Sequence, residues 1–268
     1  MKMQHYKPYK LSGLVDLIWE GRYDTPFNLK ILPTARVELI FNLSSEPNIN
    51  QALKINNRNS PLKHFCFLSG LHTQPLDLQF ERFYTIGLQM KPVAIKALWG
   101  IPSCEVRDYY NEGKLIIKDL QCIEDKLKSN ISFLEKARWL EDYIYNRVNE
   151  TANLHQAIKL HDTCENFIQN KTYSGCSTIH DMLGYSRTQT FRIFNEWFGL
   201  SSHSYQKLIQ FVQSVHHLHT STGNLTENAG NNGFYDQAHF IRSFKSFSGM
   251  TPGEYRKQMT HIPGQLFS

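Results

Sequence analysis

The spacing of apolar residues changes once along the chain, and no other feature constrains the fold as much. Before Lys91-Pro92, apolar and polar residues tend to alternate, whereas after it apolar residues recur every three or four positions. Alternation is the pattern of a half-buried strand, and a period of about 3.6 is that of an amphipathic helix. The sequence therefore predicts a β-rich part followed by a helical part, an α+β fold.

The best-defined strand covers residues 35–43. Its alternation places Ala35, Val37, Leu39, Phe41 and Leu43 on one face, and Arg36, Glu38, Ile40 and Asn42 on the other. Similar segments lie near residues 14–20, 65–68 and 83–90, and they are separated by turn-forming pairs such as Pro47-Asn48, Asn56-Asn57 and Ser69-Gly70. We expect a mostly β barrel or sandwich with flanking helices.

Arg36 and Glu38 share one face of this strand, two positions apart. Two interpretations are open, because the two side chains either line an effector pocket or form an ion pair on the surface. A surface ion pair is the commoner arrangement and adds little to stability. The sequence alone therefore favours the ion pair.

The helical part includes an amphipathic helix predicted over residues 132–148, whose apolar positions include Leu134 and Ile144. The polar segment 149–153 has no periodicity and is the predicted linker. From there to the end of the sequence only helices are expected. The predicted division is residues 1–150, a sensor or dimerisation domain, and residues 151–262, an all-α domain.

Two units, each with a short helix, a turn and a second helix, are predicted in the C-terminal third. In the first unit, a hydroxyl of Ser177 or Thr178 caps the short helix and Gly184 ends it. Ser186 and Gln189 have the spacing of a capping box, which begins the second helix. The predicted outer face of that helix carries Arg187, Thr188, Phe191 and Arg192. Its predicted inward stripe is Thr190, Ile193, Phe194 and Trp197.

A helix predicted over residues 204–218 joins the first unit to the second. In the second unit, Asn224 and Glu227 form another capping-box pattern, and Gly233 ends the short helix. Asp236 is placed to cap the last helix, whose predicted buried stripe is Phe240, Phe244 and Phe247. The outer side of this helix carries Gln237, His239, Arg242 and Lys245.

Two such helices suit double-stranded DNA. The major groove is about 12 Å wide, accepts one α-helix and presents a distinct set of donors and acceptors at each base pair. Two helices held about 34 Å apart on one side of the duplex would enter successive major grooves. The pattern therefore predicts sequence-specific binding to a bipartite DNA site.

Residues 177–257 resemble the DNA-binding domain of the AraC/XylS family of bacterial regulators. The resemblance rests on the run from Gly233-Phe234 through Phe240-Ile241-Arg242 to Phe244-Lys245, on Gly249-Met250-Thr251-Pro252 and on Tyr255-Arg256. The N-terminal half resembles an uncharacterised domain that often precedes such units, through Ile31-Leu32-Pro33-Thr34 and Gly87-Leu88-Gln89-Met90. These resemblances imply a transcription activator that contacts RNA polymerase, with a small-molecule effector site or a homodimer interface in the N-terminal half.

By the same resemblance, the outward residues of the two second helices contact promoter DNA. Arg192 and Arg242 are the expected base contacts, each worth about 1–3 kcal/mol of discrimination if bidentate to guanine. Arg187 and Lys245 are expected to contact phosphates, which position the protein without specifying sequence. The weaker candidates for base contact are Thr188, Gln237, His239 and, against a thymine methyl group, Phe191.

The charge of this region is low for a DNA-binding surface. Between residues 178 and 257, seven Lys or Arg residues stand against five Asp or Glu residues, a formal charge of +2. The joining helix also has Gln210 and Ser214 where the family usually has arginine and alanine. We therefore expect modest affinity that depends strongly on salt. An interaction protein with weakened DNA binding is one alternative.

A DNA-binding module fused to a cysteine-dependent enzyme is the second alternative. Such an enzyme needs an activated thiolate, and Cys66, two residues after His64, has no further supporting motif. No nucleophile elbow, zinc-protease, P-loop or dinucleotide-binding motif is present. The sequence therefore predicts no enzyme and no cofactor.

The remaining expectations concern metals and location. His216, His217 and His219 have no carboxylate or thiolate at matching helical spacing, so no metal site is expected. The five cysteines are scattered, and no run of about 18 apolar residues suits a membrane span. We expect a cytoplasmic protein with reduced thiols.

Overall fold

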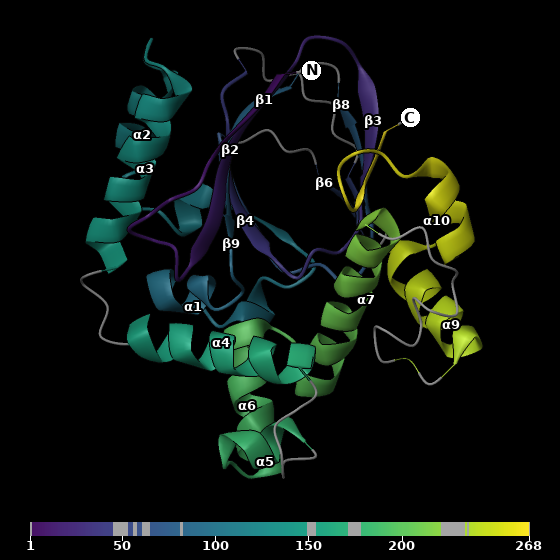
Figure 1. The fold of residues 1–268 in the computed structure, drawn as a ribbon. Coiled ribbons are helices and arrows are strands. Elements are labelled where there is room, and N and C mark those ends of the chain that lie inside the picture. Colours follow the sequence, from purple (N-terminus) through teal and green to yellow (C-terminus); the bar gives the residue numbers. More distant parts are fainter. Residues whose placement is uncertain are drawn as a thin grey trace.

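The N-terminal half is built on a six-stranded sheet (Figure 1). The computed structural model describes residues 2–44, 53–55, 58–60, 65–80, 83–148, 154–170, 178–220, 234 and 236–267. The sheet order is β1 (Lys2–Tyr6), β2 (Val15–Tyr23), β9 (Phe83–Met90), β4 (Val37–Asn42), β7 (Cys66–Ser69) and β10 (Tyr110–Glu112). All neighbouring strands are antiparallel, so side chains on every strand alternate between the same two faces.

A second, smaller sheet faces the first. Its order is β11 (Gln265–Phe267), β3 (Phe27–Ile31) and β8 (Leu76–Phe80), and a separate hairpin pairs β5 (Leu53–Ile55) with β6 (Arg58–Ser60). Ile40 and Phe67 of the large sheet pack in one cluster with Leu76 and Leu78 of the small sheet. Both sheets have open edges among the described strands. The N-terminal half is therefore a sandwich, one of the two expected forms, and not a closed barrel.

The alternation predicted for residues 35–43 is confirmed. Val37, Leu39 and Phe41 are buried in the main core. The opposite face, which carries Arg36, Glu38, Ile40 and Asn42, lines a cavity of about 340 Å³ between the two sheets. The polar residues of this strand therefore face an internal cavity and not the outer surface.

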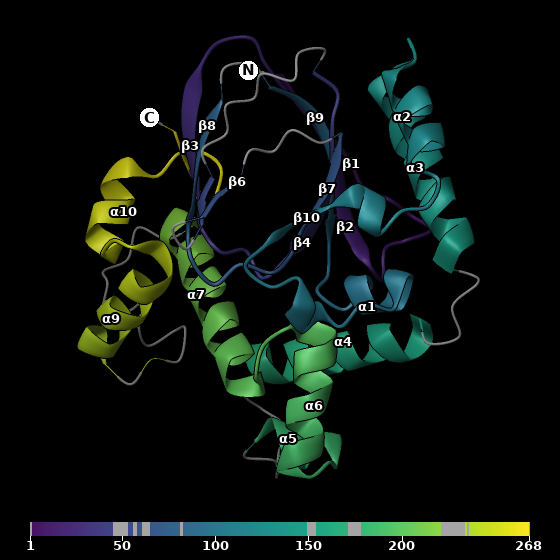
Figure 2. The ribbon, with the colours of Figure 1, turned by 180° about the vertical axis from the view of Figure 1, so that it is seen from behind.

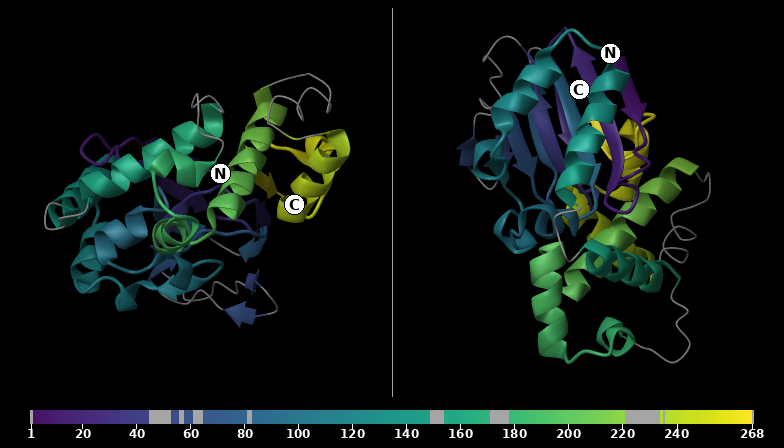
Figure 3. Two further views of the ribbon diagram at one scale, coloured as in Figure 1. Left: turned by 90° about the horizontal axis from the view of Figure 1, so that it is seen from below. Right: turned by 90° about the vertical axis from the view of Figure 1, so that its left-hand side faces the viewer.

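Helices cover the outer face of the large sheet, as seen from the side in Figure 3. They are α1 (Ala94–Trp99), α2 (Leu120–Lys128) and α3 (Phe133–Val148), and two 3-10 turns, η1 (Ser103–Glu105) and η2 (Gly113–Leu115), lie in the same region of the chain. The helix predicted over residues 132–148 is confirmed as α3. Its predicted apolar face is partly wrong, because Leu134 is 44% exposed and the buried stripe runs through Phe133, Ala137, Leu140 and Ile144.

The described residues of the C-terminal half up to residue 258 lie mainly in helices. Its helices are α4 (Leu154–Asn170), α5 (Ile179–Leu183), α6 (Arg187–Phe198), α7 (Ser202–Thr220), α9 (Gln237–Ser248) and α10 (Pro252–Gln258). The long helix α7 lies between α6 and α9 in both views of the ribbon (Figures 1 and 2). The turn pairs at 47–48 and 56–57, the linker 149–153, and the predicted short helix with Asn224, Glu227 and Gly233 lie outside the described residues.

The expectation that only helices follow the linker is wrong. After α10 the chain returns to the N-terminal half through residues 259–267, here termed the return segment, and ends in β11, antiparallel to β3. Gln265 pairs with Ile31, and the Leu32 amide donates to the Gly264 carbonyl at 2.8 Å. The physical reason is the edge of β3, whose unpaired backbone groups accept a further strand. So short a strand has no periodicity that the sequence could reveal.

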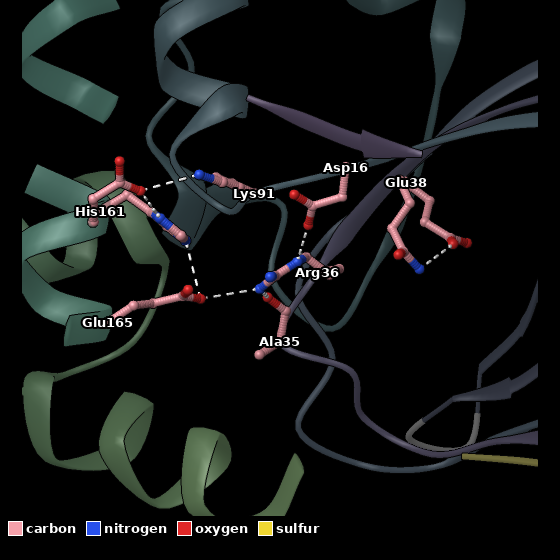
Figure 4. A network of polar contacts seen from close by, with 9 residues as sticks. Asp16, Ala35, Arg36, Glu38, Lys91, His161 and Glu165 are labelled. Atoms are coloured by element: carbon pink, nitrogen blue, oxygen red, sulfur yellow. Dashed lines mark hydrogen bonds and ion pairs between the residues drawn. The ribbon is translucent and has the colours of Figure 1, made fainter. Parts of the chain in front are cut away.

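A polar network joins the sheet to α4 (Figure 4). Arg36 contacts Asp16 of β2 and lies 3.1 Å from Glu165 of α4, and His161 lies 3.2 Å from the same Glu165 carboxylate. Arg36 forms no ion pair with Glu38 among the described residues, so the surface pair favoured by the sequence does not form. Burial alone would raise the pKa of Glu165, but hydrogen bonding to His161 and the charge of Arg36 lower it to about 2.

Replacement of a buried ring should be far more harmful than replacement of an exposed one on the same helix. Phe194 is fully buried and stacks on Phe198 at 4.7 Å, whereas Phe191 is 54% exposed. We expect Phe194→Ala to lower the free energy of unfolding by roughly 3–5 kcal/mol. Phe191→Ala is the matched control and should leave it nearly unchanged, as measured by urea denaturation. Equal losses in the two variants would contradict the packing of α6.

Removal of the Glu165 charge should destabilise the protein in a pH-dependent way. The pKa of Glu165 is lower in the folded chain than in the unfolded chain, where it is about 4.3. The Glu165 carboxylate therefore stabilises the fold above about pH 4.3, and this stabilisation is lost as the pH falls toward 2. We expect Glu165→Gln to lower the free energy of unfolding by roughly 1–3 kcal/mol at pH 7. The difference from wild type should shrink between pH 5 and 3.

Asp142→Asn provides the control for this measurement. Asp142 pairs with Lys10 on the surface, where both side chains are about half exposed, and its replacement should have no measurable effect on stability. Denaturation curves at pH 7, 5 and 3 test both variants. A constant difference between wild type and Glu165→Gln over this range would contradict the network.

Candidate nucleic-acid interface

The first unit has the geometry predicted from its capping residues. The Thr178 hydroxyl accepts from the Asp181 amide at the start of α5, and Gly184 ends that helix with a left-handed φ of 71°. Ser186 and Gln189 then form a complete capping box at the start of α6. The turn between the two helices is therefore determined by local hydrogen bonds and by one glycine.

The outer side of α6 carries the residues expected there. Arg187, Thr188, Phe191 and Arg192 are all exposed. Thr190 and Phe194 are buried, as predicted, while Ile193 and Trp197 are only half-buried. The fully buried Phe198 is absent from the predicted stripe.

The second unit presents a comparable surface on α9. The Asp236 carboxylate accepts from the His239 amide at 2.6 Å, which confirms the predicted cap. Phe240 and Phe244 are fully buried. The side chains left on the outside are Gln237, Arg242 and Lys245, whereas His239 is half-buried beside the ring of Phe234.

The helix α7 supports both units through aromatic contacts. Near its start, Tyr205 packs on Phe198 of α6, with ring centroids 4.6 Å apart. Further along, Phe211 packs on Phe244 of α9 at 5.1 Å. One rigid helix therefore sets the spacing between α6 and α9, as expected from the predicted joining helix.

The far end of α6 is attached to the N-terminal half. The Ser103 hydroxyl donates to the Trp197 carbonyl at 3.1 Å, and Arg107 donates to the Gly199 carbonyl at 3.0 Å. Lys96 forms an ion pair with Glu196. A Cβ at Gly199 would lie 2.9 Å from the Ser103 carbonyl oxygen, so only glycine permits this approach. The first unit is therefore oriented by the sheet domain as well as by α7.

One exposed aromatic residue beside this surface was missed from the sequence. Tyr185, in the turn immediately before the Ser186 cap, is 45% exposed. The position of Tyr185 next to the cap of the second helix could have predicted this exposure, since side chains in a turn often project into solvent. The outer surface of the first unit therefore includes the turn as well as α6.

The buried cysteines do not have the properties of activated thiolates. Burial raises the pKa of the Cys66 and Cys164 thiols well above the ordinary value. A nucleophilic cysteine needs a lowered pKa. His64 lies outside the described residues, so its position relative to Cys66 is not defined. Within the described residues, no helix combines the length and apolar composition that a membrane span requires.

Comparison with known proteins assigns a family model to each half of the chain. Residues 179–258 match a helix-turn-helix domain, and residues 4–112 match a domain of unknown function (DUF6597). No curated protein matches the sequence significantly. The second match confirms the resemblance of the N-terminal half to an uncharacterised domain.

Solved structures of ToxT from Vibrio cholerae are among those similar to this chain. ToxT of strain SCE256 with an unsaturated fatty acid bound has 13% identity and a TM-score of 0.46, and the match covers 91% of this chain and 95% of the ToxT chain. ToxT of strain O395 has 12% identity and a TM-score of 0.44, and the match covers 97% of this chain and 99% of the ToxT chain. The same protein bound to (E)-4-(8-methylnaphthalen-1-yl)but-3-enoic acid has a TM-score of 0.43 at 12% identity, covering 96% and 99%.

The signature residues, the geometry of α6 and α9 and the matching family model agree with one another. Both helices are capped, both are supported by α7, and both present exposed basic and polar side chains. The matched model spans both units. The chain carries an AraC-type helix-turn-helix domain behind a β-rich domain of unknown function, and it is a DNA-binding transcription regulator.

Proposed function

We propose that the protein is a transcription activator that binds a bipartite promoter site through α6 and α9. The observation that carries this proposal is the exposure of Arg192 on one helix and Arg242 on the other, with α7 between them. Residues 151–262 are the proposed DNA-binding domain, and residues 1–150 the proposed sensor or dimerisation domain. Activation would proceed through contact with RNA polymerase.

The proposed contacts divide into two classes. Arg192 and Arg242 contact bases, because guanidinium groups can donate two hydrogen bonds to guanine. Arg187 and Lys245 contact phosphates. The weaker proposed base contacts are Thr188, Phe191, Gln237 and His239. His239 is the least accessible of them, since it is half-buried.

The cavity between the two sheets supports effector binding by the N-terminal half. Its volume of about 340 Å³ lies within the range of small-molecule sites. Arg36 and Glu38 both line it, which favours the effector-pocket interpretation of this pair. A homodimer formed by the N-terminal half remains part of the proposal, supported by the low charge of the helical domain.

Loss of either principal arginine should remove one half of the recognised site. Sequences bound by the wild type would be selected from a random double-stranded DNA pool at near-physiological salt. We expect an enriched bipartite motif, and we expect Arg192→Ala and Arg242→Ala each to lose one half of it at a cost of roughly 1–3 kcal/mol. Arg138→Ala, on the exposed side of α3, is the control and should retain both halves.

The selection also decides between the proposal and its alternative. An interaction protein with weakened DNA binding would show no enriched motif at all. A motif that neither substitution alters would exclude α6 and α9 as the base-contacting helices. In that case the exposed arginines would be ordinary solvated residues.

Phosphate contacts should have a different signature. We expect Arg187→Ala and Lys245→Ala to weaken binding about equally for all sequences, and to reduce the slope of log K against log salt by roughly 1 each. Fluorescence anisotropy between 50 and 200 mM salt measures this slope. An unchanged slope in either variant would remove that residue from the phosphate contacts.

A further inference from the structure

The floor of the cavity consists of two neighbouring cross-strand rows of the large sheet. Strand register places Gln89, Glu38, Ser69 and Tyr110 in one row across β9, β4, β7 and β10. The adjacent row contains Trp19, Gly87, Ile40 and Phe67 across β2, β9, β4 and β7. A polar row therefore lies beside an apolar and aromatic row, so the floor is amphipathic.

Glu38 is the charged group of the polar row. The Gln89 amide donates to its carboxylate at a long 3.4 Å, and Trp19 also bonds to it. No ion pair joins Glu38 to a cation within the part of the chain that the structure describes, and Figure 4 shows the Glu38 side chain lying apart from Arg36 and its two carboxylate partners. Burial raises the pKa of Glu38 to about 7, as expected for a carboxylate without a compensating charge.

The other ionisable groups of the cavity offer little to an anionic ligand. Arg36 is the one Arg or Lys among the described residues that line it, and it is already engaged by Asp16 and Glu165. Burial lowers the pKa of His72 to about 4, so this side chain is neutral at pH 7. The cavity therefore favours a positive charge over a negative one.

The apolar row offers a flat surface next to Glu38. The Trp19 indole lies directly over Gly87, where a Cβ would be 2.3 Å from the ring. This absence of a side chain at Gly87 allows the indole to lie close to the sheet. Aromatic faces also attract cations, so Trp19, Phe67 and Tyr110 are compatible with an ammonium group at the boundary between the two rows.

The return segment forms part of the wall of this cavity. Its residues Ile262, Pro263 and Gln265 line the space. The Gly264 amide in the same segment donates to the Tyr255 hydroxyl at 2.9 Å. The ring of Tyr255 packs on Phe244 of α9, with centroids 5.7 Å apart. A short physical path therefore leads from the cavity to the second DNA-binding helix.

We propose that the cavity binds a small aromatic or apolar amine, whose ammonium group contacts Glu38 and whose apolar body packs on the row that contains Trp19, Gly87, Ile40 and Phe67. We also propose that the return segment transmits the binding of this amine to α9. The first part stands on the cavity alone, while the second part rests on the proposed function. Thr85 adds a further polar point, because its buried hydroxyl lines the cavity and has no hydrogen-bond partner among the residues that the structure describes.

Three probes with the same body and different charge test the ligand class. They are 4-phenylbutylamine, 4-phenylbutanol and 4-phenylbutyrate, titrated into the full chain by calorimetry at pH 7.5. We expect the amine to bind at least tenfold more tightly than the alcohol, and the butyrate to bind most weakly. Glu38→Gln should abolish the advantage of the amine over the alcohol, while Glu135→Gln, the same change on the exposed side of α3, should preserve it.

Three results would overturn the assignment of an amine as the ligand of the cavity. They are equal affinities for the amine and the alcohol, tightest binding of the butyrate, and no binding of any probe. The fold of Glu38→Gln is checked independently by urea denaturation. Retained binding of the alcohol by this variant shows that the cavity itself is intact.

The coupling to α9 has its own readouts. In hydrogen exchange, the amine should slow deuterium uptake by residues 260–267 of the wild type. It should also change the affinity for the selected DNA at least threefold. In Tyr255→Phe, which removes the hydroxyl that accepts from the Gly264 amide, the amine should still bind but the change in DNA affinity should vanish.

These readouts separate the two proposals. A wild type that binds the amine without any change in exchange of residues 260–267 or in DNA affinity would overturn the coupling. A wild type that selects no DNA either with or without the amine would instead contradict the proposed function, and the calorimetry would still test the cavity.

Discussion

The strands of the large sheet bury every second side chain against helices and turn the side chains between them toward the second sheet. In β4, Val37, Leu39 and Phe41 enter the helix-covered core, and Glu38 and Ile40 face the cavity. A shift of register by one residue would exchange these two sets. The packing of α1 and α3, the cavity and the contact of Arg36 with α4 all depend on this alternation.

The two helix-turn-helix units are attached to the sandwich at separate places. The first unit is held through α6, where Ser103 and Arg107 bind the backbone at the end of the helix. The second unit is held through the return segment, which joins β3. Because α7 connects the two units, the positions of α6 and α9 depend on both attachments and on the helix between them. The domain of unknown function therefore contributes to the geometry of the proposed DNA-binding surface.

Local signals in the sequence predicted much of this structure, and contacts between distant segments were beyond them. Capping residues such as Ser186 and Asp236, and glycines such as Gly184, act within four residues, so their geometry follows from the sequence. The alternation in residues 35–43 could also be predicted, because it depends only on neighbouring positions. The partners of the polar face could not be predicted, because Arg36 pairs with Glu165, which lies more than a hundred positions later in the sequence. Strand β11 was not predicted for the same reason. Three residues are too few to show a periodic pattern, and the strand is stabilised by pairing with the edge of β3, which is far away in the sequence.

The pairing of β3 with β11 has a consequence for how the molecule is made. The two strands are neighbours in space, but both helix-turn-helix units lie between them in the sequence. During synthesis the ribosome produces β11 only after these units, so the small sheet and the cavity wall are completed last. Contacts between such distant segments form slowly, because a long loop must close first. A nascent chain therefore acquires its helical domain before its cavity is enclosed, and an incomplete chain would lack the strand that ties the two halves together.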